Sequence, residues 1–203
     1  MSITTVITDL GGVIVSVHKE RLAEGLSKYT DVSAEEIEKN FSSTTLTDFD
    51  LDLNLGLITP KQFFDRCVRE FRLKRIDFET FKRVYSDIFD LIEGTAEILK
   101  EQAKKRKIVL LSNTDAIHYA FYSKKYKDVF DLFYAQATSF GVHARKPDRK
   151  IYLEALRMAG EKPENCVYID DIKEYADAAT KLGIHGIHFK SPEQLRAELK
   201  KLD

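Results

Sequence analysis

The sequence contains only two cysteines and has no excess of charge of either sign. The spacing of Cys67 and Cys166 matches neither a set of metal ligands nor a framework of disulfide bonds. This argues against a fold that depends on disulfides or on zinc for its stability. We therefore expect both thiols to be reduced. Lys and Arg total 32 against 33 for Asp and Glu, so no long-range field favours nucleic acid or an anionic membrane as a partner.

Long apolar runs and targeting signals are also missing. No apolar run approaches the roughly 18 residues that a membrane-spanning helix needs, and no basic-then-apolar signal opens the chain. The basic run at residues 104–107 precedes a predicted strand, where cations complement the end of a helix, and we interpret it as a solvated face. These features predict a cytoplasmic protein without membrane or nucleic-acid partners, and none of them sets an oligomeric state.

The length of 203 residues and the 43% hydrophobic content suit one large domain, or one domain that carries an insert. Short apolar runs indicate strands at residues 6–7, 108–111, 132–135, 167–169 and 184–189. Amphipathic helical segments separate most of these strands. Strands that alternate with helices are typical of an α/β fold, and we predict a doubly wound, mostly parallel Rossmann-like sheet.

The segment between the first two predicted strands has a different character. Residues 17–90 read as helical almost throughout, with apolar faces rich in phenylalanine. Such faces are typical of a small helical bundle with an aromatic core. We therefore predict a helical-bundle cap at residues 17–90, inserted into an α/β core that consists of residues 1–16 and 91–203.

Local signals within the predicted cap mark where its helices begin. Ser33 with Glu36, and Thr59 with Gln62, form capping-box patterns, in which a hydroxyl and a carboxyl or amide group satisfy the first free N–H groups of a helix. Between these two starts lies a segment rich in Thr and Asp, and we expect a loop at residues 42–58.

The functional interpretation depends on residues 4–15, in which a β-branched apolar run ends at Asp9. Gly11 and Gly12 follow directly, and they allow the backbone to turn tightly and to approach a ligand without a Cβ in the way. A single carboxylate at the end of a strand can equally well satisfy the amides of a turn. The role of Asp9 is therefore decided by what lies near it.

Polar side chains follow other predicted strands at the points where those strands end. Ser112 and Asn113 follow the second strand, and Asp170 and Asp171 follow a later one. Lys146 belongs to a loop after a further strand. Because the carboxyl ends of parallel strands meet at one edge of a sheet, we expect these groups to lie together near the first carboxylate.

The types of these residues point to phosphoryl transfer. Three carboxylates suit Mg²⁺, while a hydroxyl, an amide and an ammonium group complement a phosphate. Asp9 would attack phosphorus in line, and water would later cleave the resulting aspartyl-phosphate. A phosphoacceptor receiver domain uses similar groups, but its paired acids lie on the first strand and it has no helical insert. We therefore expect an enzyme that acts on a small phosphorylated metabolite.

Four short motifs resemble, in order, those of the haloacid dehalogenase-like (HAD) hydrolase superfamily. They are Asp-Leu-Gly-Gly-Val from residue 9, Leu-Ser-Asn-Thr from 111, Arg-Lys-Pro from 145 and Tyr-Ile-Asp-Asp from 168. Within the superfamily the chain is similar to bacterial sugar-1-phosphate phosphatases and to the phosphatase domain of soluble epoxide hydrolases, which carry a helical cap. The resemblance implies an aspartyl-phosphate on Asp9, with Lys146 as the second catalytic residue.

The same resemblance implies two sets of binding residues. The implied Mg²⁺ ligands are Asp9, the backbone carbonyl of Gly11, Asp170 and Asp171. The implied phosphate-binding residues are Leu10, Gly11, Ser112, Asn113 and Lys146.

One departure from the family pattern concerns Gly11. Most family phosphatases carry a second Asp at this position, two residues after the nucleophile, as the general acid and base. The glycine can keep the metal site, because the backbone carbonyl is the implied ligand, but it removes the acid. We therefore predict a phosphatase of small phosphomonoesters with good leaving groups, and the alternative is a weak or inactive pseudoenzyme that binds metal and phosphate.

Other features bear on how complete the site is. His18, at the start of the predicted cap, is a candidate replacement for the missing acid, although a lone histidine at a hinge is more often a surface or packing residue. Asp48, Asp50 and Asp52 are expected to be solvated, because carboxylates near a phosphate repel it. The loop before Lys146 looks longer than the family norm, which leaves the reach of this lysine open.

Overall fold

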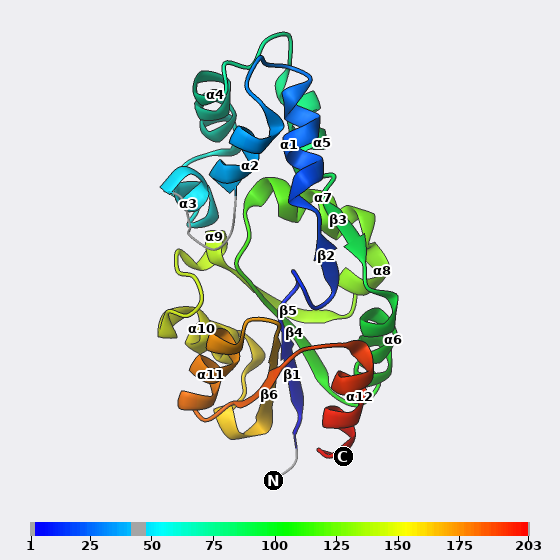
Figure 1. Cartoon of the computed structure of the whole chain (residues 1–203). Coiled ribbons are helices and arrows are strands. Elements are labelled where there is room, and N and C mark those ends of the chain that lie inside the picture. Colours follow the sequence, from blue (N-terminus) through cyan, green and yellow to red (C-terminus); the bar gives the residue numbers. More distant parts are fainter. Residues whose placement is uncertain (1–2, 42–47, 203) are drawn as a thin grey trace.

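The computed structural model describes residues 3–41 and 48–202. Its centre is a five-stranded parallel sheet in the order β5-β4-β1-β6-β7 (Figure 1). The strands are β1 (Thr5–Thr8), β4 (Lys107–Ser112), β5 (Phe133–Thr138), β6 (Cys166–Asp170) and β7 (His185–His188). The strand order reverses beside β1, where doubly wound sheets bind their ligands. The predicted fold class is confirmed.

Helices cover both faces of this sheet. On one face lie α10 (Arg149–Ala159) and α11 (Lys173–Lys181), and on the other lie α6 (Glu93–Gln102) and α12 (Pro192–Lys200) (Figure 1). The shorter or peripheral helices are α7 (Ala116–Lys125), α8 (Lys127–Phe130), α9 (Ser139–Val142) and the 3₁₀ turn η1 (Pro163–Asn165). Within the two described ranges, no helix is long and apolar enough to cross a membrane.

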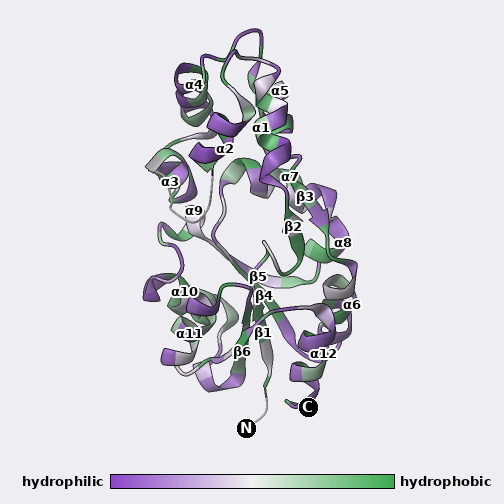
Figure 2. Cartoon of the chain, viewed as in Figure 1, coloured by the Kyte–Doolittle hydropathy of each residue, from purple (hydrophilic) through white to green (hydrophobic). Residues whose placement is uncertain are grey.

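Alternate residues of the strands serve two separate cores, as the pleat requires. Val6 packs in the core that includes α6 and α12, whereas Ile7 packs in the core formed with α10 and α11. In Figure 2 the central strands are coloured as hydrophobic, and the surrounding helices carry hydrophilic stretches. Because both faces are covered, β4 and β6 are nearly continuous buried runs, whereas the edge strands β5 and β7 also carry exposed or half-buried residues.

Among the described residues between 18 and 88, five helices form one bundle, which we call the insert (Figure 1). They are α1 (Lys19–Ser27), α2 (Ala34–Phe41), α3 (Asp48–Asn54), α4 (Pro60–Glu70) and α5 (Phe78–Ser86). Their interior is aromatic, with Phe63, Phe81 and Tyr85 in mutual ring contact. The predicted capping patterns are present, since the hydroxyl of Thr59 accepts from the Gln62 amide and that of Ser33 from the Glu36 amide.

Two expectations for the insert need correction. The loop predicted at residues 42–58 contains the helix α3, and its residues 42–47 lie outside the described part of the chain. The chain is also not helical up to residue 91, because β3 (Phe89–Leu91) pairs antiparallel with β2 (Val15–Val17). This ribbon spans both predicted domain boundaries. Strands of three residues have no detectable period, and their pairing depends on a partner far away in the sequence.

The basic run is also not entirely solvated. Arg106 is buried, and its guanidinium donates to the backbone carbonyls of Ile3 and Leu202 and to the side chain of Gln102. Lys104 is exposed, as expected. Arg106 therefore ties the two described ends of the chain to the helix before β4.

Candidate active site

Asp9 directly follows β1 and is held in a defined position. Its backbone N–H donates to the carbonyl of Ile169 at 2.9 Å, which continues the pairing between β1 and β6. One carboxylate oxygen, Oδ1, accepts from the N–H of Leu10 at 2.7 Å, and the other, Oδ2, lies 2.8 Å from the Nζ of Lys146. The residue is 7% exposed. In this arrangement the Leu10 amide binds Asp9 itself, so it is engaged before any phosphate is bound.

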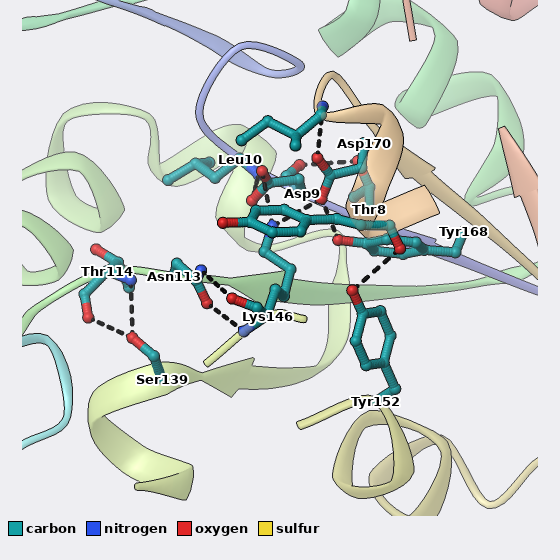
Figure 3. A network of polar contacts seen from close by, with 12 residues as sticks. Thr8, Asp9, Leu10, Asn113, Thr114, Ser139, Lys146, Tyr152, Tyr168 and Asp170 are labelled. Carbon is teal, nitrogen blue, oxygen red and sulfur yellow. Dashed lines mark hydrogen bonds and ion pairs between the residues drawn. The ribbon is translucent and has the colours of Figure 1, made fainter. Parts of the chain in front are cut away.

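Lys146 reaches the site across the edge of the sheet (Figure 3). Its ammonium group is buried and lies 2.8 Å from both Asp9 Oδ2 and Asp170 Oδ2. Asn113 holds the lysine backbone by a reciprocal pair of hydrogen bonds, accepting from the Lys146 N–H at 2.8 Å and donating to its carbonyl at 3.2 Å. The loop before Lys146 therefore does not prevent its side chain from reaching Asp9.

Asp170 ends β6 and is fully buried. Besides Lys146, its Oδ2 accepts from the hydroxyl of Tyr168, and its Oδ1 accepts from the N–H of Ile172 at 2.8 Å (Figure 3). A buried carboxylate needs such partners to remain charged. These contacts tie Asp170 to Lys146 and to the loop that follows β6.

Asp171 lies against the loop that follows β1. A Cβ added to Gly12 would come within 2.1 Å of an Asp171 carboxylate oxygen, and Gly12 has a φ of +74°. Only glycine adopts this conformation without strain and leaves room for the carboxylate. Asp9, Asp170 and Asp171 each offer an oxygen within 4.8 Å of the others. This cluster of hard oxygen donors is of the kind that Mg²⁺ prefers.

The electrostatics of the cluster show a shortage of positive charge. Burial and the charge of Asp170 raise the pKa of Asp9 to about 7, although Lys146 opposes the rise. Burial and Asp170 also raise the pKa of Asp171. Burial disfavours the charged form of Lys146, but the two adjacent carboxylates outweigh this effect and raise the pKa of the ammonium. One ammonium thus faces three carboxylates, and a divalent cation would balance them.

The segment after β4 leads into α7 without being part of it. This helix begins at Ala116, and its N-cap is Asp115, whose carboxylate accepts from the backbone N–H groups of Ile117 and His118. Ser112 and Asn113 therefore precede the helix instead of forming its N-terminus. The side-chain amide of Asn113 is engaged with Lys146, whereas Ser112 lines the cavity beside Asp9.

A second link stabilises the same edge of the sheet. The Ser139 hydroxyl accepts from the N–H of Thr114 at 2.9 Å and donates to its carbonyl at 2.8 Å (Figure 3). The Tyr122 hydroxyl donates to Thr114 Oγ1. Together with the Asn113–Lys146 pair, these bonds join the loops after β4 and β5. This edge of the sheet beside Asp9 is thus held by hydrogen bonds between side chains and backbone groups.

A cavity of about 230 Å³ opens beside this cluster, between the core and the insert. The core contributes Gly11, Ser112 and Asn113, and the insert contributes residues from α1, α2 and α3. Apolar side chains, including Phe41 and Phe89, form part of the wall. A substrate bound at Asp9 would therefore have its remaining atoms between the two parts of the chain.

Three charged residues of the cavity have no predicted role. Lys19 and Asp50 come from the insert, and Arg145 comes from the loop before Lys146. The expectation that Asp50 is solvated is wrong, because Asp50 is largely buried. This burial raises the pKa of its carboxyl group, and the charge of Arg145 partly opposes the rise. Asp52 instead pairs with Arg66 on α4 at 2.8 Å. No local pattern marks Lys19 or Asp50, because only packing brings α1 and α3 to this cavity.

The histidine that lines the cavity is His118. Its Nδ1 lies 2.7 Å from Asp115 Oδ2, and its ring stacks on Tyr85 of α5 at 4.2 Å between centroids. His18, the candidate proton donor, does not line the cavity. Its ring nitrogens lie 3.1 Å from a Glu20 carboxylate oxygen and 3.3 Å from one of Asp90. This position fits the interpretation of His18 as a surface residue.

Several known proteins are similar to this chain in sequence or in fold. Phosphatase MT3486 of Mycobacterium tuberculosis (strain CDC 1551 / Oshkosh) is 26% identical over 196 residues, which cover 91% of this chain and 86% of that protein. The HAD family enzyme BT-2542 of Bacteroides thetaiotaomicron, solved with magnesium and inorganic phosphate, superposes with a TM-score of 0.81 at 26% identity, over 94% of this chain and 96% of that one.

A predicted HAD-like family hydrolase of Porphyromonas gingivalis superposes with a TM-score of 0.83 at 20% identity, over 100% of this chain and 98% of that one, which shows likeness of fold. The sequence model of the haloacid dehalogenase-like hydrolases matches residues 3–183. This match includes β1 with Asp9, the segment after β4, Lys146, and the Asp170-Asp171 pair. The chain therefore belongs to the haloacid dehalogenase-like hydrolase family.

Proposed function

We propose that the protein is a Mg²⁺-dependent phosphatase of small phosphomonoesters that forms an aspartyl-phosphate on Asp9. The observation that carries this proposal is the convergence, at the end of β1, of Asp9, a buried Lys146 and two further carboxylates. The curated relative named a phosphatase and the neighbour solved with magnesium and phosphate support it.

The residues at the site fit a magnesium ion. Asp9, Asp170 and Asp171 supply oxygens close enough to share one cation, and the raised pKa of Asp9 reflects the lack of counter-charge that such a cation would supply. We propose these carboxylates and the carbonyl of Gly11 as its ligands. Bound there, Mg²⁺ would neutralise charge on the phosphate and on the cluster.

The reaction proceeds in two displacements. A carboxylate oxygen of Asp9 attacks phosphorus, and the bond from phosphorus to the ester oxygen breaks as the leaving alcohol departs. Lys146 keeps Asp9 ionised and binds phosphate oxygens, as do the Ser112 hydroxyl and the backbone of Gly11 and Asn113. Water then cleaves the phosphorus–oxygen bond of the aspartyl-phosphate and releases inorganic phosphate.

Gly11 limits which leaving groups depart easily. Loss of a general acid typically slows a reaction about 10²- to 10⁴-fold, and the loss is greatest for alcohols that need protonation. Anomeric sugar oxygens, acyl oxygens and aryl oxygens leave with less help than a primary alkoxide. We therefore propose a preference for sugar-1-phosphates, acyl phosphates and aryl phosphates. The second candidate, a pseudoenzyme that binds metal and phosphate, also rests on Gly11.

A panel of phosphate monoesters with graded leaving-group pKa, measured with and without Mg²⁺, tests the proposal. We expect turnover only with Mg²⁺, and kcat/KM that falls steeply as the leaving-group pKa rises. The pseudoenzyme predicts instead that no ester is cleaved while vanadate still binds in the presence of Mg²⁺. Turnover of equal rate in the presence of a chelator would contradict both functions.

Restoring the acid is expected to change this dependence. A Cβ at Gly11 would meet only Val17 Cγ2, at 3.5 Å, which is an ordinary contact, so the backbone leaves room for the Cβ of an aspartate. We expect Gly11→Asp to raise kcat/KM for primary alkyl phosphates about tenfold or more, and to speed the loss of the phosphoenzyme. Gly11→Asn is the matched control, because it has the same size without an acid. Equal rates for the two variants would show that another group supplies the proton.

We also propose that the insert acts as a cap. It contacts the core on two sides of the cavity, through the Tyr85–His118 stack and through His143 Nδ1, which lies 2.7 Å from the carbonyl of Leu55. Opening would separate both contacts and expose the cavity to water, whereas closure would exclude water during the attack on phosphorus. Distances between labels on α3 and α10, measured with and without vanadate and Mg²⁺, should shorten on binding.

A further inference from the structure

Arg145 is a half-buried cation at the cavity next to Asp9, and two of its donor atoms are buried without a partner among the described residues. Its Nε and Nη1 atoms are inaccessible to solvent and have no hydrogen-bond acceptor among residues 3–41 and 48–202. The guanidinium cannot lose its proton under ordinary conditions, so these N–H groups stay donors at any working pH. An unmet buried donor on a charged group is costly, and such groups usually have a partner that the chain itself does not supply.

The surrounding charges indicate what that partner is. Lys19 lines the same cavity, and its Nζ donates to the carbonyl of Phe41 at 2.8 Å. Asp50 is the carboxylate whose charge acts on both cations, and no salt bridge joins it to Arg145 among the described residues. The other carboxylate of the cavity, Asp115, is engaged by the backbone N–H groups of Ile117 and His118 and by the His118 ring. The Nε and Nη1 donors of Arg145 thus lack an acceptor, and an anionic group on a ligand would supply one.

Lys146 already provides the cation for the phosphate that reacts with Asp9. Its ammonium lies between Asp9 and Asp170, whereas Arg145 lines the cavity whose other walls come from α1, α2 and α3 of the insert. The two adjacent residues thus present separate positive charges. The second charge faces the space that the leaving group of a phosphomonoester would fill.

We infer that the leaving group of the substrate carries a second anionic group, a carboxylate or another phosphate, which Arg145 binds. This inference rests on the proposed function, and it names the class of phosphomonoester that the site accepts. The cavity of about 230 Å³ lies below the roughly 300–1,000 Å³ of sites for drug-sized ligands, which favours a small phosphorylated acid. The planar guanidinium matches carboxylate and phosphate oxygens in geometry as well as charge.

Calorimetry with phosphonates that cannot be hydrolysed tests the inference without turnover. Three probes are titrated in the presence of Mg²⁺, and all of them carry a phosphonate at one end. The other end is a carboxylate in 3-phosphonopropanoate, an uncharged hydroxyl in 3-hydroxypropylphosphonate and a second phosphonate in propane-1,3-bisphosphonate. We expect one of the two probes with a second anionic end to bind at least about tenfold more tightly than the probe with the hydroxyl end. The identity of the tighter probe shows whether Arg145 binds a carboxylate or a second phosphate.

Variants of Arg145 then locate the effect. Arg145→Gln should abolish the preference, and Arg145→Lys should keep part of it, while the exposed Arg149→Gln, four residues along the chain, should leave it unchanged. Equal affinities of the wild type for all probes would overturn the inference. A preference that survives in Arg145→Gln would overturn it too. An equal loss of affinity for every probe in this variant would also overturn it, because it would mean that Arg145 binds the reacting phosphate.

Failure of the proposed function is recognised separately. If the preference is present and depends on Arg145 while no ester is hydrolysed, the inference holds for a binding protein and the phosphatase proposal fails. If esters are hydrolysed but the probes bind equally, the phosphatase proposal holds and the inference fails.

Discussion

Asp9→Asn is expected to lower kcat for a phosphate monoester by at least about 10⁴-fold, because the amide cannot attack phosphorus. Asparagine has nearly the same shape as aspartate, and its carbonyl oxygen can keep one of the two contacts, with Leu10 N–H or with Lys146. Mass detection after quenching should find a phosphoenzyme in the wild type and none in the variant. The matched control is Asp177→Asn, which removes an exposed carboxylate that pairs with Lys173 on α11.

The same variant is expected to be more stable than the wild type when metal is removed above neutral pH. The folded-state pKa of Asp9, about 7, is raised from its ordinary 3.8, so the folded chain binds this proton more strongly than the unfolded chain. The stabilisation of the folded chain by protonated Asp9 is present in full below about pH 4 and is lost as pH rises to about 7. Asp9→Asn removes that loss, and we expect a gain of roughly 2 kcal/mol, or about 5 °C in Tm, at pH 8.

Thermal unfolding of both proteins between pH 5 and pH 8, with a chelator and with Mg²⁺, measures this effect. The wild type should lose stability with rising pH in the chelator and recover it with Mg²⁺, whereas the variant should change less in both respects. A variant that is inactive and also less stable at pH 8 would mean that the ion pair between Asp9 and Lys146 outweighs the burial of its charge.

Lys146→Met is expected to destabilise the chain strongly, because it leaves the buried carboxylates of Asp9 and Asp170 without their shared ammonium. Removing one partner of a buried ion pair typically costs about 3–5 kcal/mol. The loss should be largest at high pH without metal, since protonation of Asp9 or binding of Mg²⁺ relieves the repulsion. Urea unfolding at pH 8 measures it, and Lys104→Met, at an exposed lysine, serves as the control.

Phosphate binding provides a second measurement on the same pair of variants. In the presence of Mg²⁺, we expect Lys146→Met to weaken vanadate binding about 100-fold, while Lys104→Met should leave it within twofold of the wild type. Equal effects of the two substitutions on vanadate binding would refute the role proposed for Lys146. An unchanged stability of Lys146→Met would show that its two carboxylate partners are not charged together.

The arrangement of the core could be predicted because its signals are local. The strand that ends at Asp9, the strand before Ser112 and the strand before Asp170 each stand out as apolar runs, and parallel pairing brings their carboxyl ends to one edge. The structure places Asp9, Lys146 and Asp170 in direct contact there. The roles of these residues as nucleophile, ligands and phosphate-binding groups stay predictions.

Long-range contacts decided what the sequence pattern could not. The ribbon of β2 and β3 depends on pairing between segments separated by the whole insert, and α3 lies in a stretch rich in turn-forming residues. The Leu10 amide and the Asn113 side chain are engaged by neighbours that no spacing rule names. Contacts of this kind follow from packing, which overrides local preference in short elements.

The sequence by itself therefore determined which side chains meet at the edge of the sheet, because they stand at the ends of apolar runs that form parallel strands. Only the tertiary structure decided which charged groups line the cavity beside them. Lys19, Asp50 and Arg145 come from three separate segments, and they form one charged cavity because the insert folds over the core. The unpaired donors of Arg145 become visible only when its surroundings are known, since burial and missing partners are properties of the packed chain.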